Sequence, residues 1–136
     1  MDITHDSVLL LIKIASAIFT AILMLQSGLD KVFNYAGNKE WLTEFFAKSP
    51  LNGTVSALLP ILTILELAAG GFSAVGAVLL LVNKENQTAA FLGILFATAS
   101  FICLFFGQRL AKDYASAVNM TVYFIFSLFG LLVYSM

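Results

Sequence analysis

Four long runs of apolar residues constrain this chain more than any other feature of its sequence. Each run has about 20 residues or more, the length that an α-helix needs to cross the hydrocarbon core of a bilayer. The backbone finds no water there, so each run is predicted to be helical despite its many β-branched and aromatic residues. The predicted spans cover residues 7–29, 55–82, 88–107 and 115–134.

The composition indicates a lipid environment. Of the 136 residues, 60% are hydrophobic and 11% are charged, whereas soluble domains have about 25% charged residues. So few charges cannot cover the surface of a soluble globule of this size. The net charge of −1 argues against a nucleic-acid partner, which would require clustered Lys and Arg. We therefore expect an all-α integral membrane protein, with residues 1–136 forming one four-helix bundle that contacts the lipid bilayer.

The connections between the runs predict how the helices are arranged. Two short turns join the last three spans, which are therefore expected to be antiparallel neighbours. The longer connection between the first two spans contains an amphipathic pattern at 38–48, where Trp41, Leu42, Phe45 and Phe46 share one face. We expect a short amphipathic helix in the membrane interface. A segment that only closes one end of the bundle is the alternative.

The distribution of Lys and Arg over the loops predicts the orientation. Lys84 lies on one side of the membrane. The opposite side holds five cations, which are Lys31, Lys39, Lys48, Arg109 and Lys112. By the positive-inside rule, this second side faces the cytoplasm. Both termini are then expected to face outward.

Glu66, the one charged residue of the second span, is the first candidate for function. It lies about 16 Å along the predicted helix, where a carboxylate costs about 2.5–3.5 kcal/mol. It must therefore face the bundle interior, find partners or take up a proton. A hydrogen-bonded structural residue and a proton-handling or ligand-binding carboxylate are both compatible with this position. Pro60, six residues earlier, is expected to kink the helix and widen a cavity.

Other polar residues gather on the side of the membrane where the second span begins. Gln26 and Asp30 are four residues apart and share a helix face. We expect one polar cavity, open to that side, formed by Glu66, Asp30, Lys31, Gln108 and Arg109, with Asn119 and Tyr123. Ordinary snorkelling to the interface is the alternative for Lys31 and Arg109.

The remaining polar and sulfur-containing candidates have structural interpretations. Asp113 is expected to cap the fourth span, because a carboxylate accepts free N–H groups there and suits the helix dipole. Cys103 is the one cysteine and lies in an apolar run, so it is interpreted as a small core residue. His5 is the one histidine, which leaves the sequence without the usual His-rich metal site and without a histidine pair for haem.

Two stretches carry a family resemblance. The first span ends in Ser-Gly-Leu-Asp-Lys-Val-Phe at 27–33, and the second contains Leu-Glu-Leu-Ala-Ala-Gly-Gly-Phe at 65–72. These stretches resemble the Gly-x-x-Lys and Glu-x-x-x-Gly-Gly motifs of the DoxX family, small four-helix bacterial membrane proteins. Carried over residue by residue, the resemblance points to Gly28, Lys31, Glu66, Gly70, Gly71 and Gly76. The glycines also have a packing interpretation, since they let the second span approach a neighbouring helix.

The resemblance implies a bacterial inner-membrane protein associated with a quinone-linked or other redox complex, together with a membrane-protein partner or a second copy of the chain. The chain has no cysteine pair and no haem-ligand pair, so electron transfer would require quinone itself or a partner with a cofactor. In this hypothesis Glu66 gives or takes the proton that accompanies quinone reduction. Lys31 or Arg109 stabilises the developing oxyanion.

Two other classes of function remain open from the sequence. A non-catalytic scaffold or assembly subunit would use the long apolar faces to bind a larger membrane complex. A small proton-coupled transporter would use Glu66 to carry the proton. The small multidrug-resistance pumps have a comparable glutamate, but theirs lies in the first helix.

Overall fold

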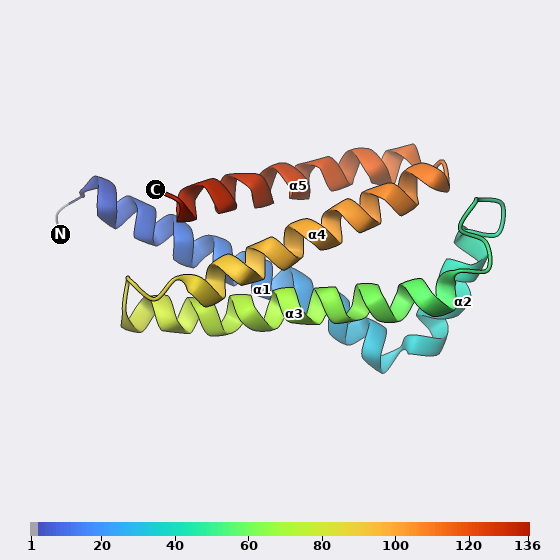
Figure 1. Cartoon of the computed structure of the whole chain (residues 1–136), viewed down its shortest axis with the longest axis horizontal. Coiled ribbons are helices and arrows are strands. Elements are labelled where there is room, and N and C mark those ends of the chain that lie inside the picture. Colours follow the sequence, from blue (N-terminus) through green and yellow to red (C-terminus); the bar gives the residue numbers. More distant parts are fainter. Residues whose placement is uncertain (1–2) are drawn as a thin grey trace.

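The computed structural model describes residues 3–136 and shows five α-helices joined by short connections (Figure 1). Four of them are long and apolar enough to cross a membrane. The helices are α1 (His5–Phe33), α2 (Tyr35–Phe45), α3 (Val55–Val82), α4 (Thr88–Leu110) and α5 (Tyr114–Tyr134). No strand is present within residues 3–136. The predicted all-α class and four-helix membrane bundle are confirmed, and the chain is a multi-pass membrane protein.

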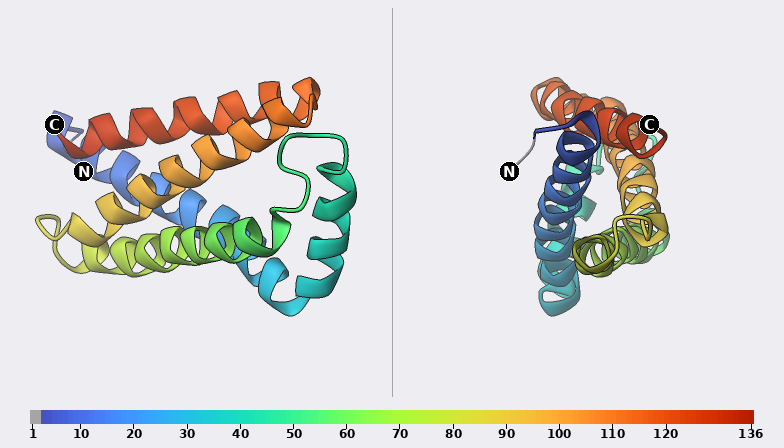
Figure 2. Two further views of the ribbon diagram at one scale, coloured as in Figure 1. Left: turned by 45° about the vertical axis from the view of Figure 1, so that its right-hand side comes forward. Right: turned by 90° about the vertical axis from the view of Figure 1, so that its left-hand side faces the viewer.

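The four long helices surround a common core, and α2 lies across one end (Figure 2). Helices α3, α4 and α5 run up and down in chain order, while α1 packs along α3. Helices α1 and α5 meet near the chain termini and diverge towards the other end of the bundle (Figure 1). The loop after α2 and the turn between α4 and α5 lie at that other end, which we call the α2 end.

The helix boundaries differ modestly from the predicted ones. Helix α1 continues to Phe33, four residues beyond the predicted limit of 29, because polar residues at the membrane surface extend a helix without adding hydropathy. The α2 helix starts at Tyr35 and ends at Phe45, instead of covering 38–48. The helix starts directly after Asn34, whose backbone is not helical. The Asn34 carbonyl accepts a hydrogen bond from the Asn38 side chain at 2.8 Å. Turns occupy the residues after Phe46.

Small residues set the distance between α3 and α4. A Cβ atom on Gly76 would collide with the backbone of Ala90, and one on Gly93 would collide with Ser73. Such close approach supplies dispersion contacts where lipid gives no hydrophobic driving force. Gly71 differs, since a Cβ atom there would meet nothing within 4 Å. The packing interpretation of the glycines therefore applies to Gly76 and not, within residues 3–136, to Gly71.

Hydrogen bonds of Tyr134 in α5 hold the helices together at the end of the bundle where the chain termini lie. Its hydroxyl donates to the Lys13 carbonyl of α1 at 2.8 Å. Its own carbonyl accepts a bond from Gln87 Nε2, next to the start of α4, at 3.2 Å. Three helices are thus connected at the end opposite α2.

Candidate functional site

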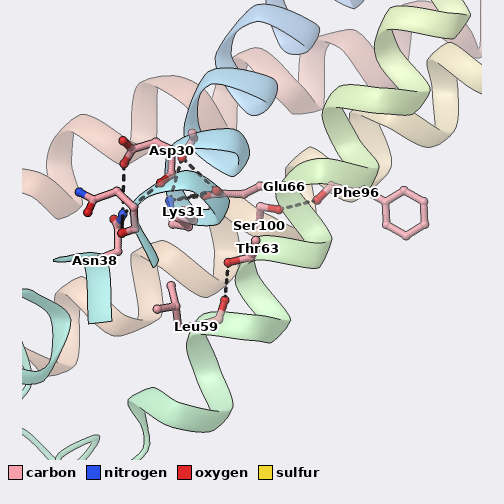
Figure 3. Close-up of polar contacts among 10 residues, drawn as sticks. Asp30, Lys31, Asn38, Leu59, Thr63, Glu66, Phe96 and Ser100 are labelled. Atoms are coloured by element: carbon pink, nitrogen blue, oxygen red, sulfur yellow. Dashed lines mark hydrogen bonds and ion pairs between the residues drawn. The ribbon is translucent and has the colours of Figure 1, made fainter. Parts of the chain in front are cut away.

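A buried ion pair connects α1 and α3 towards the α2 end of the bundle. Glu66 of α3 is 1% exposed, and Lys31 of α1 is 13% exposed. Lys31 Nζ lies 3.0 Å from Glu66 Oε2 and 3.3 Å from Oε1 (Figure 3). Ser27, one helical turn before Lys31, donates to Oε2 at 2.9 Å and accepts from Lys31 Nζ at 2.9 Å. We call Ser27, Lys31 and Glu66 the Glu66 cluster; it holds the one ion pair found among residues 3–136.

Two glycines bring the helices of this cluster together. A Cβ atom on Gly28 would lie 2.8 Å from Leu67 Cδ2, and one on Gly70 would lie 2.8 Å from the backbone nitrogen of Leu25. Each glycine neighbours the cluster in sequence or lies one turn from it, so the ion pair lies beside a close approach of α1 to α3. These contacts also fill the space beside Glu66 with aliphatic side chains.

The electrostatics of the cluster follow from its depth. A single carboxylate in the hydrocarbon region is costly, and Lys31 neutralises it while the Ser27 hydroxyl adds a further hydrogen bond. Removing one partner of a buried pair leaves an uncompensated charge and costs about 3–5 kcal/mol. Glu66 is enclosed, so the cluster meets its surroundings through the partly buried side chains of Lys31 and Ser27.

Neighbouring buried hydroxyl groups do not join the cluster. Thr63 Oγ1 donates to the Leu59 carbonyl at 2.7 Å, and Ser100 Oγ donates to the Phe96 carbonyl at 3.0 Å (Figure 3). Both side chains return to their own helix, which is the usual way to satisfy a hydroxyl inside a membrane helix. Glu66 therefore takes its hydrogen bonds from α1.

Several residues expected beside Glu66 lie elsewhere. Asp30 is exposed, and its Oδ2 accepts a bond from Asn38 Nδ2 at 3.2 Å, which joins α1 to α2 (Figure 3). Gln26 and Asn119 are exposed on the surfaces of α1 and α5. The sequence placed these residues towards one end of the bundle, but it did not show which face of each helix they occupy.

The polar residues near the end of α4 also lie apart from the cluster. Arg109 is exposed, and its guanidinium carbon lies 4.5 Å from the centre of the Tyr114 ring. Gln108 has a buried Oε1 with no hydrogen-bond partner among residues 3–136. Tyr123 stacks on Phe101 with ring centres 5.7 Å apart. The structure therefore brings Lys31 to Glu66 and leaves these side chains outside the cluster.

Asp113 is the N-cap residue of α5. Its Oδ1 accepts a hydrogen bond from the Ser116 backbone N–H at 3.2 Å. This is the contact that the sequence position predicted, and it satisfies one of the free donors at a helix start.

The cavity at the α2 end is apolar rather than polar. It has a volume of about 180 Å³ and lies between α2, α3, α4 and the loop after α2. Leu59, Ile61 and Leu62, which flank Pro60, contribute to its wall. Glu66 and the polar residues expected with it do not line it. One apolar cavity and one separate polar cluster replace the single polar cavity that we expected.

Cys103 lines this apolar cavity and is exposed, so its interpretation as a core residue was wrong. Helix α4 is apolar on every side, and its sequence therefore carried no signal for the inward face. Within residues 3–136, no group of three or more His, Cys, Asp or Glu side chains is arranged to hold a metal ion.

Comparisons with known proteins returned no match among protein-family models, curated proteins or solved structures. The resemblance to the DoxX family stays a prediction from the two motifs.

Proposed function

We propose that this chain is a DoxX-like subunit of a quinone-linked or other redox membrane complex, and that its Glu66 cluster handles protons there. The observation that supports this role is the buried carboxylate of Glu66. It is linked through Lys31 and Ser27 to the surface at the α2 end. Intramembrane ionisable residues with a specific partner are the groups that proton relays employ.

The cluster has the parts that a proton relay requires. Lys31 and Ser27 each carry exchangeable protons, and each touches the Glu66 carboxylate. The 13% exposure of Lys31 against 1% for Glu66 gives the relay an outer and an inner end. The Lys31 ammonium can therefore give a proton to Glu66 and regain one from outside, without a proton entering the apolar core.

The fit to a quinone is restricted to one side of the cluster. Leu25 and Leu67 occupy the space around Gly28 and Gly70, so a quinone head group would meet Lys31 rather than Glu66. A bound quinone, or a cofactor of a partner, would supply the electron chemistry. Lys31 would stabilise negative charge on the head-group oxygen, and Glu66 would hold the proton that balances it.

A non-catalytic assembly subunit is the second candidate, and the same geometry favours it. The charges and the hydroxyl of the Glu66 cluster satisfy one another, so the cluster needs no ligand. Its position beside a close approach of α1 to α3 is that of a structural connection. In this role the chain would act by presenting its apolar surfaces to a larger complex.

We place the protein in the bacterial inner membrane with both termini outside. The proposal rests on the cations of the α2 end, where α2, the loop after it and the α4–α5 turn lie together (Figure 2). Lys84 lies at the opposite end. The excess of positive charge predicts that the α2 end faces the cytoplasm.

The test begins with purification in mild detergent from native membranes, followed by mass spectrometry of the proteins and lipids that co-elute. We expect an oxidoreductase subunit or bound quinone in stoichiometric amounts. Recovery with a large complex that has no redox chemistry would support the assembly role. Recovery of the chain without any partner protein and without quinone would refute the redox proposal.

Variants of the ion pair separate the two candidates. Glu66→Gln should abolish quinone-linked turnover of the purified complex, while Glu85→Gln, in the exposed α3–α4 turn, should leave it unchanged. The exchanged pair Lys31→Glu with Glu66→Lys keeps an ion pair but moves the carboxylate to the outer position. If the pair handles protons, the exchanged variant should recover the thermal stability that either single replacement loses, but not the turnover. Recovery of both stability and turnover in the exchanged variant would identify the pair as a structural connection.

A further inference from the structure

The apolar cavity at the α2 end is open to the lipid. Its inner wall contains the buried side chains of Phe46, Val55 and Leu59. Its rim contains Ile61 and Phe106, which are 56% and 59% exposed on helices α3 and α4. Because these helices face hydrocarbon, a lipid chain can enter the cavity without crossing water.

The size and lining of the cavity indicate an aliphatic occupant. Apart from the Cys103 thiol, the side chains that line it carry no hydrogen-bonding group, and apolar cavities of this kind exclude water. Its volume of about 180 Å³ is well above what a single water-sized group needs. A segment of an acyl chain matches both properties.

Two lysines adjoin the residues that line the cavity. Lys48 follows the lining residue Phe46 by two positions, in the turns after α2. Lys112 follows Ala111, which packs against the lining residues Phe46, Val55 and Leu59. Both lysines are exposed, and neither has a carboxylate within 4 Å among residues 3–136. Arg109 lies two positions after the lining residue Gly107 of α4, which places it about 200° around the helix from the cavity.

The nearby carboxylates are turned away from the cavity. Glu40 and Glu44 each lie two positions from Leu42, the lining residue of α2, which places both on the opposite face of that helix. Asp113 Oδ1 is directed to the Ser116 N–H at the start of α5. The side of the α2 end that adjoins the cavity is therefore basic.

We propose that this cavity binds one acyl chain of an anionic phospholipid, whose phosphate lies against Lys48 and Lys112. Basic pockets between membrane helices on the cytoplasmic side are suited to anionic lipid head groups. This proposal is independent of the redox role, because no residue of the Glu66 cluster lines the cavity.

Fluorescence quenching by brominated lipids tests the proposal on the full chain. Trp41, the one tryptophan, is first replaced by Phe. Phe106→Trp then places a reporter at the rim of the cavity. Phe129→Trp is the matched control, because Phe129 is 54% exposed on α5 and does not line the cavity. Both variants are reconstituted in phosphatidylcholine vesicles that contain a small fraction of brominated phosphatidylglycerol or brominated phosphatidylcholine.

We expect brominated phosphatidylglycerol to quench the Phe106→Trp variant more strongly than brominated phosphatidylcholine, and both lipids to quench the Phe129→Trp variant equally. Replacing Lys48 or Lys112 with Gln should lower the preference about fivefold per cation, while Lys84→Gln should not change it. High salt should weaken the preference of the Phe106→Trp variant when its basic residues are left in place. This measurement tests the charge argument without replacing any basic residue. Equal quenching at the rim by both lipids, the same preference at both reporters, or a preference insensitive to charge and salt would overturn the proposal.

Discussion

The alanine variants of two glycines in α3 provide a direct test of the packing between α3 and α4. Both Gly76→Ala and Gly71→Ala gain helix propensity, about 1 kcal/mol in water, and this gain is common to both. At Gly76 the added methyl group meets the backbone of Ala90, which cannot rotate away as a side chain would. At Gly71 the methyl group enters open space.

The expected magnitude follows from that difference. The two helices must separate to admit the methyl group at Gly76, and overpacking of this kind costs about 1–3 kcal/mol. The shared propensity term cancels when the variants are compared. We therefore expect Gly76→Ala to be about 1–3 kcal/mol less stable than Gly71→Ala.

Reversible unfolding in mixed detergent micelles, followed by helix content, measures this difference. Equal stability of the two variants would refute the close approach of α3 and α4 at Gly76. If Gly71→Ala were instead the less stable variant, Gly71 would have to contact a second copy or a partner, and the single chain would not explain its packing.

Two further predictions concern the opposite end of the bundle and its orientation. Tyr134→Phe removes the hydrogen bond to the Lys13 carbonyl and should lower the free energy of unfolding by about 1 kcal/mol; an unchanged value in the same micelle assay would contradict that contact. In a Cys103→Ser background, a membrane-impermeant thiol reagent applied to intact cells should label Asn86→Cys and spare Asn52→Cys, since these positions lie in the turns at opposite ends of the bundle. Labelling of Asn52→Cys alone would reverse the proposed orientation.

Hydropathy predicted which segments cross the membrane because every span must satisfy its backbone internally. It did not predict the inward faces. Residues such as Cys103 and Asn119 lie on helices that are apolar on all sides, so neither periodicity nor composition indicates their direction. Their exposure depends on how α4 and α5 pack, which involves contacts between residues far apart in the sequence.

The Glu66 cluster was only partly visible in the sequence. Depth along the helices placed Lys31 and Glu66 towards the same end of the bundle, and the structure joins them. Ser27 was missed, although its spacing of four residues from Lys31 puts both side chains on one face of α1. Helical spacing from a known charged residue was the available signal.

The glycines and the charged residues of α1 and α3 are best understood as one feature. An ion pair in hydrocarbon is stable only if both groups are held at contact distance and lipid is kept from between them. Gly28 and Gly70 allow that approach, because any side chain at either position would meet Leu67 or Leu25 of the facing helix. The same approach closes the space around Glu66 and leaves Lys31 as the accessible member of the pair. Whatever reacts with or binds to this cluster therefore has to act through Lys31 or Ser27, and a change at Glu66 will be felt outside the bundle only through these two side chains.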